Sequence, residues 1–274
     1  FQAKIFLDTT YEGDLMAAAG VSYVVGRESN DLYNETINGI RPLPPPGRFP
    51  KGIDPYRVKG DPKSGLLPRI YPEWGGMIGE GDKGVQAYNY RMCLTKIPEN
   101  RIDIEKPANY DEEQYELLFR FIEVGGMNGD FFKSSQTGKF DFLKSDFLPN
   151  GKTDTNNNGY ISTDFVGMNW NYPEADYVTR AQIEKEHEEW QRGLIWTLQN
   201  HPRIPDETRR YYAQWGLTKD EFTDNDHWPY QLYIREARRM TGEYVITEHT
   251  ALGKELIADP IGLGSYHMDS HAIK

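Results

Sequence analysis

The first thirty residues restrict the fold most, because short strand and helix signals follow one another there without a long loop. An apolar run at residues 4–7 is typical of a strand, and residues 15–19 are strong helix formers. Gly20 suits the position after a helix end, and residues 21–25 are typical of a second strand. Strands of this kind need neighbours to pair with, so the segment is expected to belong to a larger sheet-containing domain.

The turn between the first strand and the helix carries groups that stabilise a helix N-terminus. Thr9 and Thr10 offer hydroxyls as N-caps. Glu12 and Asp14 place negative charge in the first turn, where the helix dipole favours it. We therefore expect a short helix directly after this turn.

The same segment resembles a motif of the FAD-dependent oxidoreductases that share the glutathione-reductase-like flavin fold. Residues 8–15 read DTTYEGDL, and residues 17–28 continue as AAAGVSYVVGRE. Further stretches resemble the family in the same order along the chain: YNYRMCLT at 88–95, NGKTDTNNNG at 150–159, residues 164–173, and QLYIREARRMTGEYV at 231–245. Each motif alone is weak, but their shared order over most of the chain makes the resemblance specific.

The resemblance implies FAD as the cofactor, with the first turn lying close to the flavin. The residues that it assigns to cofactor binding are Asp8, Thr9, Thr10, Tyr11, Glu12, Gly13 and Asp14. The chain has no G-x-G-x-x-G pattern, whose glycines let the backbone approach a dinucleotide pyrophosphate. We therefore expect the central part of a longer flavoprotein: residues 1–30 as an incomplete piece of an FAD-binding domain and residues 31–274 as a substrate or cap domain. The missing part of the flavin domain is then a candidate partner, as a separate chain.

Composition narrows the class of partner. The formal net charge of -11 argues against a nucleic-acid backbone, which needs a basic surface. No apolar run approaches the roughly 20 residues of a membrane helix, and the single Cys93 excludes an internal disulfide. A small-molecule substrate is therefore the expected partner, while the compartment stays open.

Residues 38–80 are rich in proline and glycine and show little periodicity. A long segment of this kind is either a functional lid or interface arm, or a packed irregular insertion. Residues 86–94 then alternate with the period of a strand, and one face carries Asn89 and Arg91. Asn89 is a candidate substrate-binding residue, and Arg91 is the strongest single candidate for a catalytic, substrate-facing cation.

Sequence patterns in the second half of the chain predict three helices. Asp111 and Gln114 resemble a capping box before an apolar stripe that ends near Gly125: Tyr115, Leu118, Phe121 and Ile122. The longest helix is expected at residues 174–200, before Pro202, with one face formed by Ile183, His187, Trp190, Leu194 and Leu198.

A third helix is expected to begin with Pro205 at its first position and to close at Gly216. Strands mixed with helices, without regular alternation, indicate an α+β fold with a mixed or antiparallel sheet and packed helices. By the resemblance, this is the substrate-type domain of a two-domain flavoprotein.

The asparagine-rich stretch at residues 154–161 matches the first positions of an EF-hand calcium loop, D-x-N-x-N-G-x-I. Asp154, Asn156 and Asn158 would be the ligands, but the twelfth position is Phe165 instead of an acid. The stretch also corresponds to a loop of the flavoprotein family. We therefore expect no metal, keep calcium as an alternative, and treat Asn158 as a substrate-binding candidate.

Histidines and arginines supply the remaining candidates. His187 lies on an apolar helix face, so it is expected to be a hydrogen-bonded core residue. His267 and His271 are four residues apart; in the context of the resemblance, either is a candidate catalytic acid or base near the flavin, with a surface role as the alternative. Arg235, a catalytic candidate, and Arg27, a substrate-binding candidate, each precede a glutamate at a predicted strand end. There they bind a substrate carboxylate or the flavin pyrophosphate, or they form structural ion pairs with acidic residues.

The mechanism that the resemblance implies is oxidation of a small polar substrate by hydride transfer to the flavin, with a sugar-like substrate suggested by the aromatic content. One alternative is a carbohydrate-binding or polysaccharide-lyase-associated module without redox chemistry. Another is a structural fragment that is inactive on its own. For the chain by itself, the sequence leaves open whether it is an enzyme.

Overall fold

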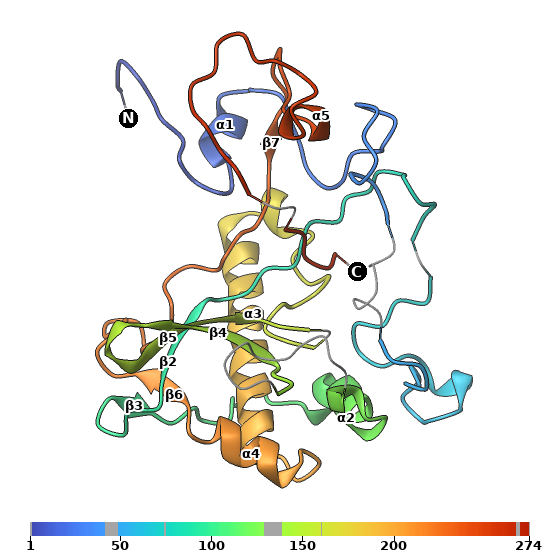
Figure 1. Ribbon diagram of the computed structural model, residues 1–274, viewed down its shortest axis with the longest axis vertical. Coiled ribbons are helices and arrows are strands. Elements are labelled where there is room, and N and C mark those ends of the chain that lie inside the picture. The colour runs from blue at the N-terminus through green and yellow to red at the C-terminus, as the bar shows by residue number, and fades with distance from the viewer. Residues whose placement is uncertain are drawn as a thin grey trace.

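The computed structural model describes residues 2–41, 49–73, 75–128, 139–159, 161–266 and 269–273. Their fold is α+β, as the sequence predicts. A five-stranded antiparallel sheet lies beside one long helix, and a two-stranded sheet lies at the end of the molecule that carries the N-terminus (Figure 1). No helix in this described part of the chain has the length and apolar character needed to cross a bilayer.

The main sheet has the strand order β3-β6-β2-β5-β4, with antiparallel neighbours throughout. Its strands are β2 (Met92–Thr95), β3 (Arg101–Ile102), β4 (Leu143–Leu148), β5 (Lys152–Asn157) and β6 (Gly216–Thr218). β4 and β5 form a hairpin whose turn contains Asn150 and Gly151, both with positive φ. Asparagine and glycine tolerate this conformation better than other residues, which explains a turn at this point.

The predicted strand at residues 86–94 is regular only from Met92 onward. Before it, the chain makes a single bridge between Asn89 and Tyr233. Asn89 lies in the interior with no exposed surface, so this part of the predicted polar face is not a solvent face. The segment that contains Tyr233 thus lies beside Asn89, whereas the Arg91 side chain on the same predicted face is 39% exposed.

Helix α3 (Tyr177–Asn200) confirms the long helix, and all five residues of its predicted face are buried. It begins at Asp176, whose carboxylate accepts a hydrogen bond from the Thr179 amide at 2.8 Å. Gln191 of α3 pairs with the backbone of Tyr90 in both directions: its Oε1 accepts from the amide at 2.5 Å, and its Nε2 donates to the carbonyl at 3.0 Å. A buried side-chain amide thus joins α3 to the strand segment.

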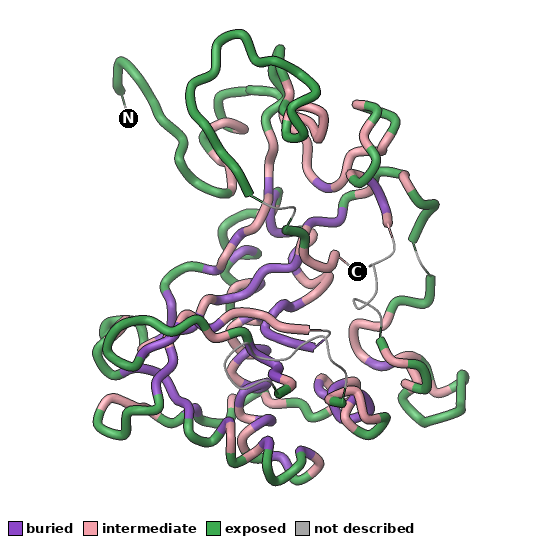
Figure 2. The backbone as a smooth tube through the Cα atoms, viewed as in Figure 1, coloured by how far each residue is buried: buried purple, intermediate pink, exposed green. Residues whose placement is uncertain are grey.

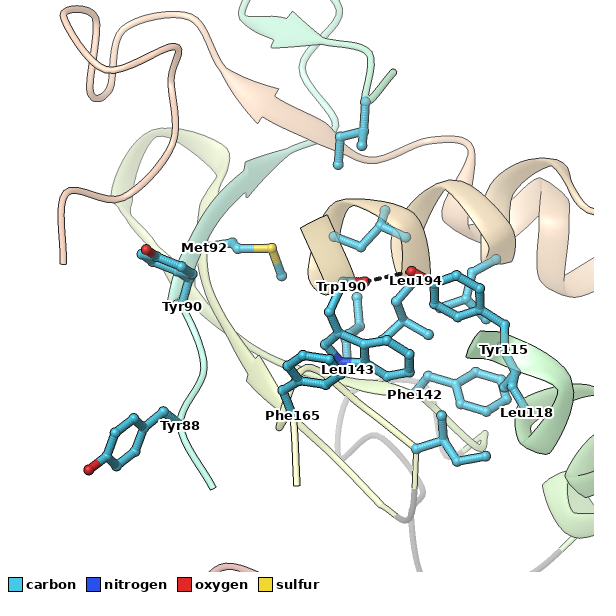
Figure 3. Close-up of a cluster of buried hydrophobic side chains, with 14 of the residues drawn as sticks. Tyr88, Tyr90, Met92, Tyr115, Leu118, Phe142, Leu143, Phe165, Trp190 and Leu194 are labelled. Atoms are coloured by element: carbon cyan, nitrogen blue, oxygen red, sulfur yellow. Dashed lines mark hydrogen bonds between the residues drawn. The ribbon is translucent and has the colours of Figure 1, made fainter. Parts of the chain in front are cut away.

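The core between α3 and the sheet is strongly aromatic (Figure 3). Tyr115 stacks on Trp190 with ring centroids 4.9 Å apart, and Trp190 stacks on Phe165 at 5.1 Å. The Tyr115 hydroxyl donates to the Trp190 carbonyl at 3.0 Å. This packing fixes Trp190 on the helix and Phe165 in the loop after β5 relative to each other.

The other two predicted helices form with shifted ends. Asp111 caps a 3₁₀ turn (Glu112–Tyr115) that continues as α2 (Glu116–Glu123), and Gly125 follows with positive φ. α4 (Asp206–Tyr212) ends before the predicted Gly216, which instead begins β6. Pro205 is the N-cap residue rather than the first helical residue.

The N-terminal segment differs most from the prediction. α1 (Asp14–Ala18) and β1 (Tyr23–Val24) form as expected, and β1 pairs with β7 (Arg239–Met240). Residues 4–7, however, form no strand, and Leu7 is 83% exposed. The predicted strand is wrong because the described chain places no strand beside it, and an unpaired strand leaves its backbone groups unsatisfied.

The start of α1 also differs from the predicted capping by Thr9 and Thr10. Gly13 is the N-cap and makes no side-chain cap. The Thr10 hydroxyl accepts from the Gly13 amide at 3.2 Å, and the Asp8 carboxylate accepts from the Met16 amide at 3.2 Å. Asp8 therefore satisfies a helix amide that a threonine was expected to satisfy.

The proline- and glycine-rich segment at 38–80 is irregular, as predicted; residues 42–48 and 74 of it lie outside the described ranges. Its one helical element is a 3₁₀ turn, Pro62–Ser64, within the described part. Arg120 of α2, only 4% exposed, donates to the carbonyls of Asp54 at 2.8 Å, Tyr56 at 2.6 Å and Arg57 at 3.1 Å. These bonds support the interpretation of a packed insertion.

Candidate functional site

A cleft of about 1450 Å³ lies between the two-stranded sheet and the end of the main sheet where β5 finishes. Its walls come from residues 24–41, 69–73, 157–166, 236–251 and 269–273, and Trp190 of α3 contributes one side. Small-molecule sites usually enclose about 300–1,000 Å³, so this cleft has room for a substrate together with part of a cofactor. Figure 2 shows mostly exposed residues at the end of the molecule that carries the N-terminus and most of the buried residues around the main sheet and the long helix.

A chain of three ionisable side chains reaches the cleft. Arg235 donates to Oδ1 of Asp164 at 3.1 Å, and the other carboxylate oxygen of Asp164 lies 2.8 Å from Nδ1 of His271. Asp164 and Arg235 have side chains only 7% and 8% exposed, whereas His271 is 13% exposed and lines the cleft. The buried pair thus holds the imidazole in one orientation at the cleft wall.

Two further contacts fix the backbone of His271. Its amide donates to Oε1 of Gln86 at 2.7 Å, and the Gln86 amide donates in turn to Glu236 at 2.8 Å. The neighbouring Ala272 carbonyl accepts from the Ala87 amide at 3.0 Å. Residues 269–273 therefore join the 86–87 segment without forming a helix. His267 itself lies outside the described residues.

Buried amides surround Arg235. Its Nη2 lies 3.3 Å from Oδ1 of Asn89 and 3.4 Å from Oδ1 of Asn157, and its Nε donates to the Ala87 carbonyl at 2.8 Å. Asn89 also donates to Oδ1 of Asn156 at 2.6 Å. Asn89 and Arg235 are therefore positioning residues in the interior, whereas Asn157 is also part of the cleft wall.

The remaining arginine candidates lie in ion pairs. Arg27 lines the cleft but binds Asp82 through two hydrogen bonds. Arg91 lies outside the cleft lining, binds Asp154 through two hydrogen bonds, and faces the Tyr233 ring at 5.3 Å. The hydrogen bonds with Asp154 raise the pKa of Arg91 above its ordinary value.

The calcium alternative is wrong as a loop, because Asp154 and Asn156 belong to strand β5 and not to a ligand loop. The Asp154 carboxylate is bound by Arg91, and Oδ1 of Asn156 accepts from Asn89. Asn158 follows the strand, lines the cleft and donates to the Asp141 carbonyl at 2.5 Å. Within the described ranges, no group of three or more histidine, cysteine or acidic residues is arranged to hold a metal.

The residues expected to bind the cofactor, 8–14, lie on the exposed N-terminal segment, and none of them is part of the cleft wall. Asp14 binds Arg180 at 2.6 and 2.8 Å and Arg238 at 2.5 Å. Hydrogen bonds from Arg180, followed by those from Arg238, lower the pKa of Asp14 to about 2. In this structure the motif joins α1 to α3 and to the segment before β7.

Several cleft residues were not singled out from the sequence, namely Arg69, Gln86, Asp164, Trp190 and Glu236. Asp164 begins a stretch that resembles the flavoprotein family, so its position carried a signal. Arg69 lies in the irregular segment, where neither periodicity nor a motif points to any residue.

The family model of the FAD dependent oxidoreductases matches residues 1–274, so the chain belongs to this family. The match confirms the resemblance seen in the sequence motifs, and it favours oxidoreductase function over a carbohydrate-binding module. FAD is the cofactor that membership implies. No curated protein and no solved structure matches the chain significantly.

The cleft suits the ring system of FAD better than its pyrophosphate. Its volume has room for a planar ring, and its wall contains aromatic and aliphatic residues, including Tyr71 and Ile161, beside charged ones. A pyrophosphate site of the usual kind needs a glycine-rich turn at a helix N-terminus. Among the described helices of eight residues or more, α2 begins with acidic residues and α3 is capped by Asp176, so neither offers that site.

Proposed function

We propose that this chain forms the substrate-facing part of an FAD-dependent oxidoreductase that acts on a small polar, sugar-like substrate. The observation that carries the proposal is the imidazole of His271, held by Asp164 and Arg235 at the wall of a large cleft in a chain of this family. When bound, FAD supplies the two-electron acceptor for the hydride that leaves the substrate. The residues of the chain bind and orient the substrate and move its proton.

His271 is the proposed general base. Its Nδ1 hydrogen donates to Asp164, which leaves Nε2, 3.6 Å from Oδ1 of Asp269, as the nitrogen that accepts a proton. Oxidation of a secondary alcohol removes one hydride from carbon and one proton from oxygen, and Nε2 takes the proton. Asp164 stabilises the imidazolium that results, and Arg235 holds the Asp164 carboxylate in place.

The proposed partner surface lies at the end of the molecule with the two-stranded sheet. Large apolar side chains are exposed there on two segments, with Ile5 at 76%, Leu7 at 83%, Ile261 at 107% and Leu263 at 104%. Exposed apolar surface of this extent marks an interaction site. In our proposal it contacts the remainder of the flavin domain, and residues 1–30 are the part of that domain carried by this chain.

A visible absorption spectrum tests the assignment. The purified chain is incubated with FAD, excess FAD is removed by gel filtration, and the flavin-to-protein ratio is measured. We expect retained flavin bands at a ratio approaching one. A colourless protein at every FAD concentration would remove the function from this chain and assign it to a longer assembly.

A further inference from the structure

Arg69 forms part of the cleft wall and lies in an unusual environment for a cation. Its guanidinium lies over the Trp190 ring at 3.9 Å and the Phe165 ring at 5.2 Å. Its two hydrogen bonds both go to Gln114, at 2.8 Å to the carbonyl and 3.3 Å to Oε1. Since a guanidinium has five N–H donors, Arg69 has further N–H groups that can donate to a ligand.

No carboxylate of the described chain lies within ion-pair distance of Arg69. Most arginines in the described ranges have such a partner, and the exceptions are Arg41, Arg69 and Arg210. Two of these three, Arg41 and Arg69, line the cleft. A charge removed from water normally needs a partner, because its desolvation is otherwise uncompensated.

Burial lowers the pKa of Arg69 to about 10, so the side chain is still charged at neutral pH. The backbone at Arg69 has a positive φ of 63°, a conformation that costs free energy for a residue with a side chain. A costly conformation that places a cation without a carboxylate at a cleft wall points to a ligand that offsets the cost.

We propose that Arg69 is an anion-binding residue and that the substrate of this oxidoreductase carries a carboxylate group, as a sugar acid does. Arg69 binds the carboxylate through two parallel N–H donors, while Trp190 supports the plane of the guanidinium. This inference rests on the proposed function only where it assigns the anion to the substrate.

Arg69 and His271 line the same cleft and contact neighbouring residues of one segment. Phe165 contacts the Arg69 guanidinium, and the preceding residue, Asp164, binds His271. One short segment of chain therefore positions both the anion-binding group and the proton acceptor. The acidic residues that line the cleft are Glu28, Glu35, Glu73, Asp164, Glu236, Glu248 and Asp269. None of them lies within ion-pair distance of Arg69, and Glu28 and Glu236 are paired with Arg239.

The test uses gluconate and sorbitol as a matched pair of open-chain probes, in which the carboxylate of gluconate is replaced by a CH2OH group in sorbitol. Binding to the full chain without FAD is measured by calorimetry and by tryptophan fluorescence at constant ionic strength. The variants are Arg69→Gln, Arg69→Lys and, as a control, Arg210→Gln, which removes an arginine that also lacks an ion pair but lies on α4 outside the cleft.

We expect gluconate to bind the unchanged chain and Arg210→Gln equally, at least 10-fold more weakly to Arg69→Gln, and with intermediate affinity to Arg69→Lys. Sorbitol should bind at least 10-fold more weakly than gluconate. Equal gluconate binding by Arg69→Gln, or no gluconate binding by the unchanged chain, would overturn the proposal.

Two further measurements distinguish a substrate anion from a cofactor anion, and a failure of this inference from a failure of the proposed function. If inorganic pyrophosphate binds more tightly than gluconate and FAD displaces it, the anion belongs to the cofactor, and the substrate assignment is overturned. Flavin retention by Arg69→Gln is measured separately. Loss of gluconate binding with flavin retained supports the inference, whereas a chain that never retains flavin refutes the proposed function and leaves the anion site standing.

Discussion

His187 is the residue whose environment most clearly determines its charge. It has no exposed surface, its Nδ1 lies 2.7 Å from the Ile183 carbonyl, and Nε2 has no partner. Burial lowers its pKa from 6.5 to about 4. The folded protein therefore holds a neutral imidazole over a pH range in which the unfolded chain carries a charged one.

This difference makes stability depend on pH. Because the folded pKa is depressed, the contribution of His187 is present above about pH 6.5 and is lost as the pH falls toward 4. We expect the free energy of unfolding to fall by about 2 kcal/mol between pH 7 and pH 5. Urea unfolding at both values measures it. His187→Gln should show a smaller decrease, and an equal decrease in the variant would contradict this account.

His271 and His249 provide a matched pair for the proposed proton transfer. His271 lines the cleft, whereas His249 is not part of its wall and has Nε2 2.9 Å from the Asn34 carbonyl. With FAD bound, we expect His271→Gln to slow flavin bleaching by sugar acids about 10²–10⁴-fold, and His249→Gln to leave it unchanged. Anaerobic stopped-flow absorbance measures the rate. Equal rates in the two variants would exclude His271 as the base.

At the scale of elements, Asp14 fastens α1 to the rest of the molecule. Its carboxylate binds Arg180 and Arg238, whose side chains are 6% and 9% exposed. Asp14→Asn leaves both cations buried with a neutral partner. We expect the free energy of unfolding at pH 7 to decrease by about 2 kcal/mol, measured by urea unfolding, because solvent reaches the pair and screens part of the interaction.

The control for this variant is Asp146→Asn, which removes an exposed ion pair with Lys144 and should change stability little. Because the Asp14 pKa is depressed to about 2, the stabilisation is present above about pH 4 and is lost as the pH falls toward 2. The role would be contradicted if the unchanged chain lost stability as the pH rose above 4 while Asp14→Asn did not.

The irregular segment depends on Arg120 in a comparable way. Arg120 donates to three carbonyls of residues 54–57 and binds Glu116 at 2.7 Å. We expect Arg120→Met to accelerate chymotrypsin cleavage after Tyr56 at least 10-fold, because those carbonyls lose their donor. Lys59→Met removes only an exposed pair with Glu123 and should not change the rate. Equal cleavage rates would show that other contacts hold the segment.

At the level of helices and strands, the sequence correctly predicted the features that depend on neighbouring residues alone. The apolar face and the stop signal of α3 define that helix almost completely, and Gly20 and Gly125 both follow helices with positive φ. Residues 4–7 have the composition of a strand, but the described chain places no strand beside them. Strand pairing depends on the tertiary fold, so local composition does not predict it. Gly216 illustrates the same limit, because it enters β6 opposite Thr95 and does not end a helix.

For the whole molecule, the motifs identified the family correctly, but they did not predict the cleft. Its walls come from segments far apart in the chain, and Arg69, Asp164 and His271 meet there only after folding. Arg91 was the strongest candidate in the sequence, yet it binds Asp154 and lies outside the cleft lining. Charge and spacing in a sequence do not reveal which cations are already paired.

The central claim is that the flavin ring and the substrate share this cleft, and an FAD titration of two tryptophan variants tests it most directly. Val166 lines the cleft, whereas Val178 is 81% exposed on α3 and lies outside it. Quenching of flavin fluorescence on binding gives the affinity for FAD. We predict that Val166→Trp weakens FAD binding at least 10-fold while Val178→Trp leaves it unchanged; equal affinity in both variants would contradict the account.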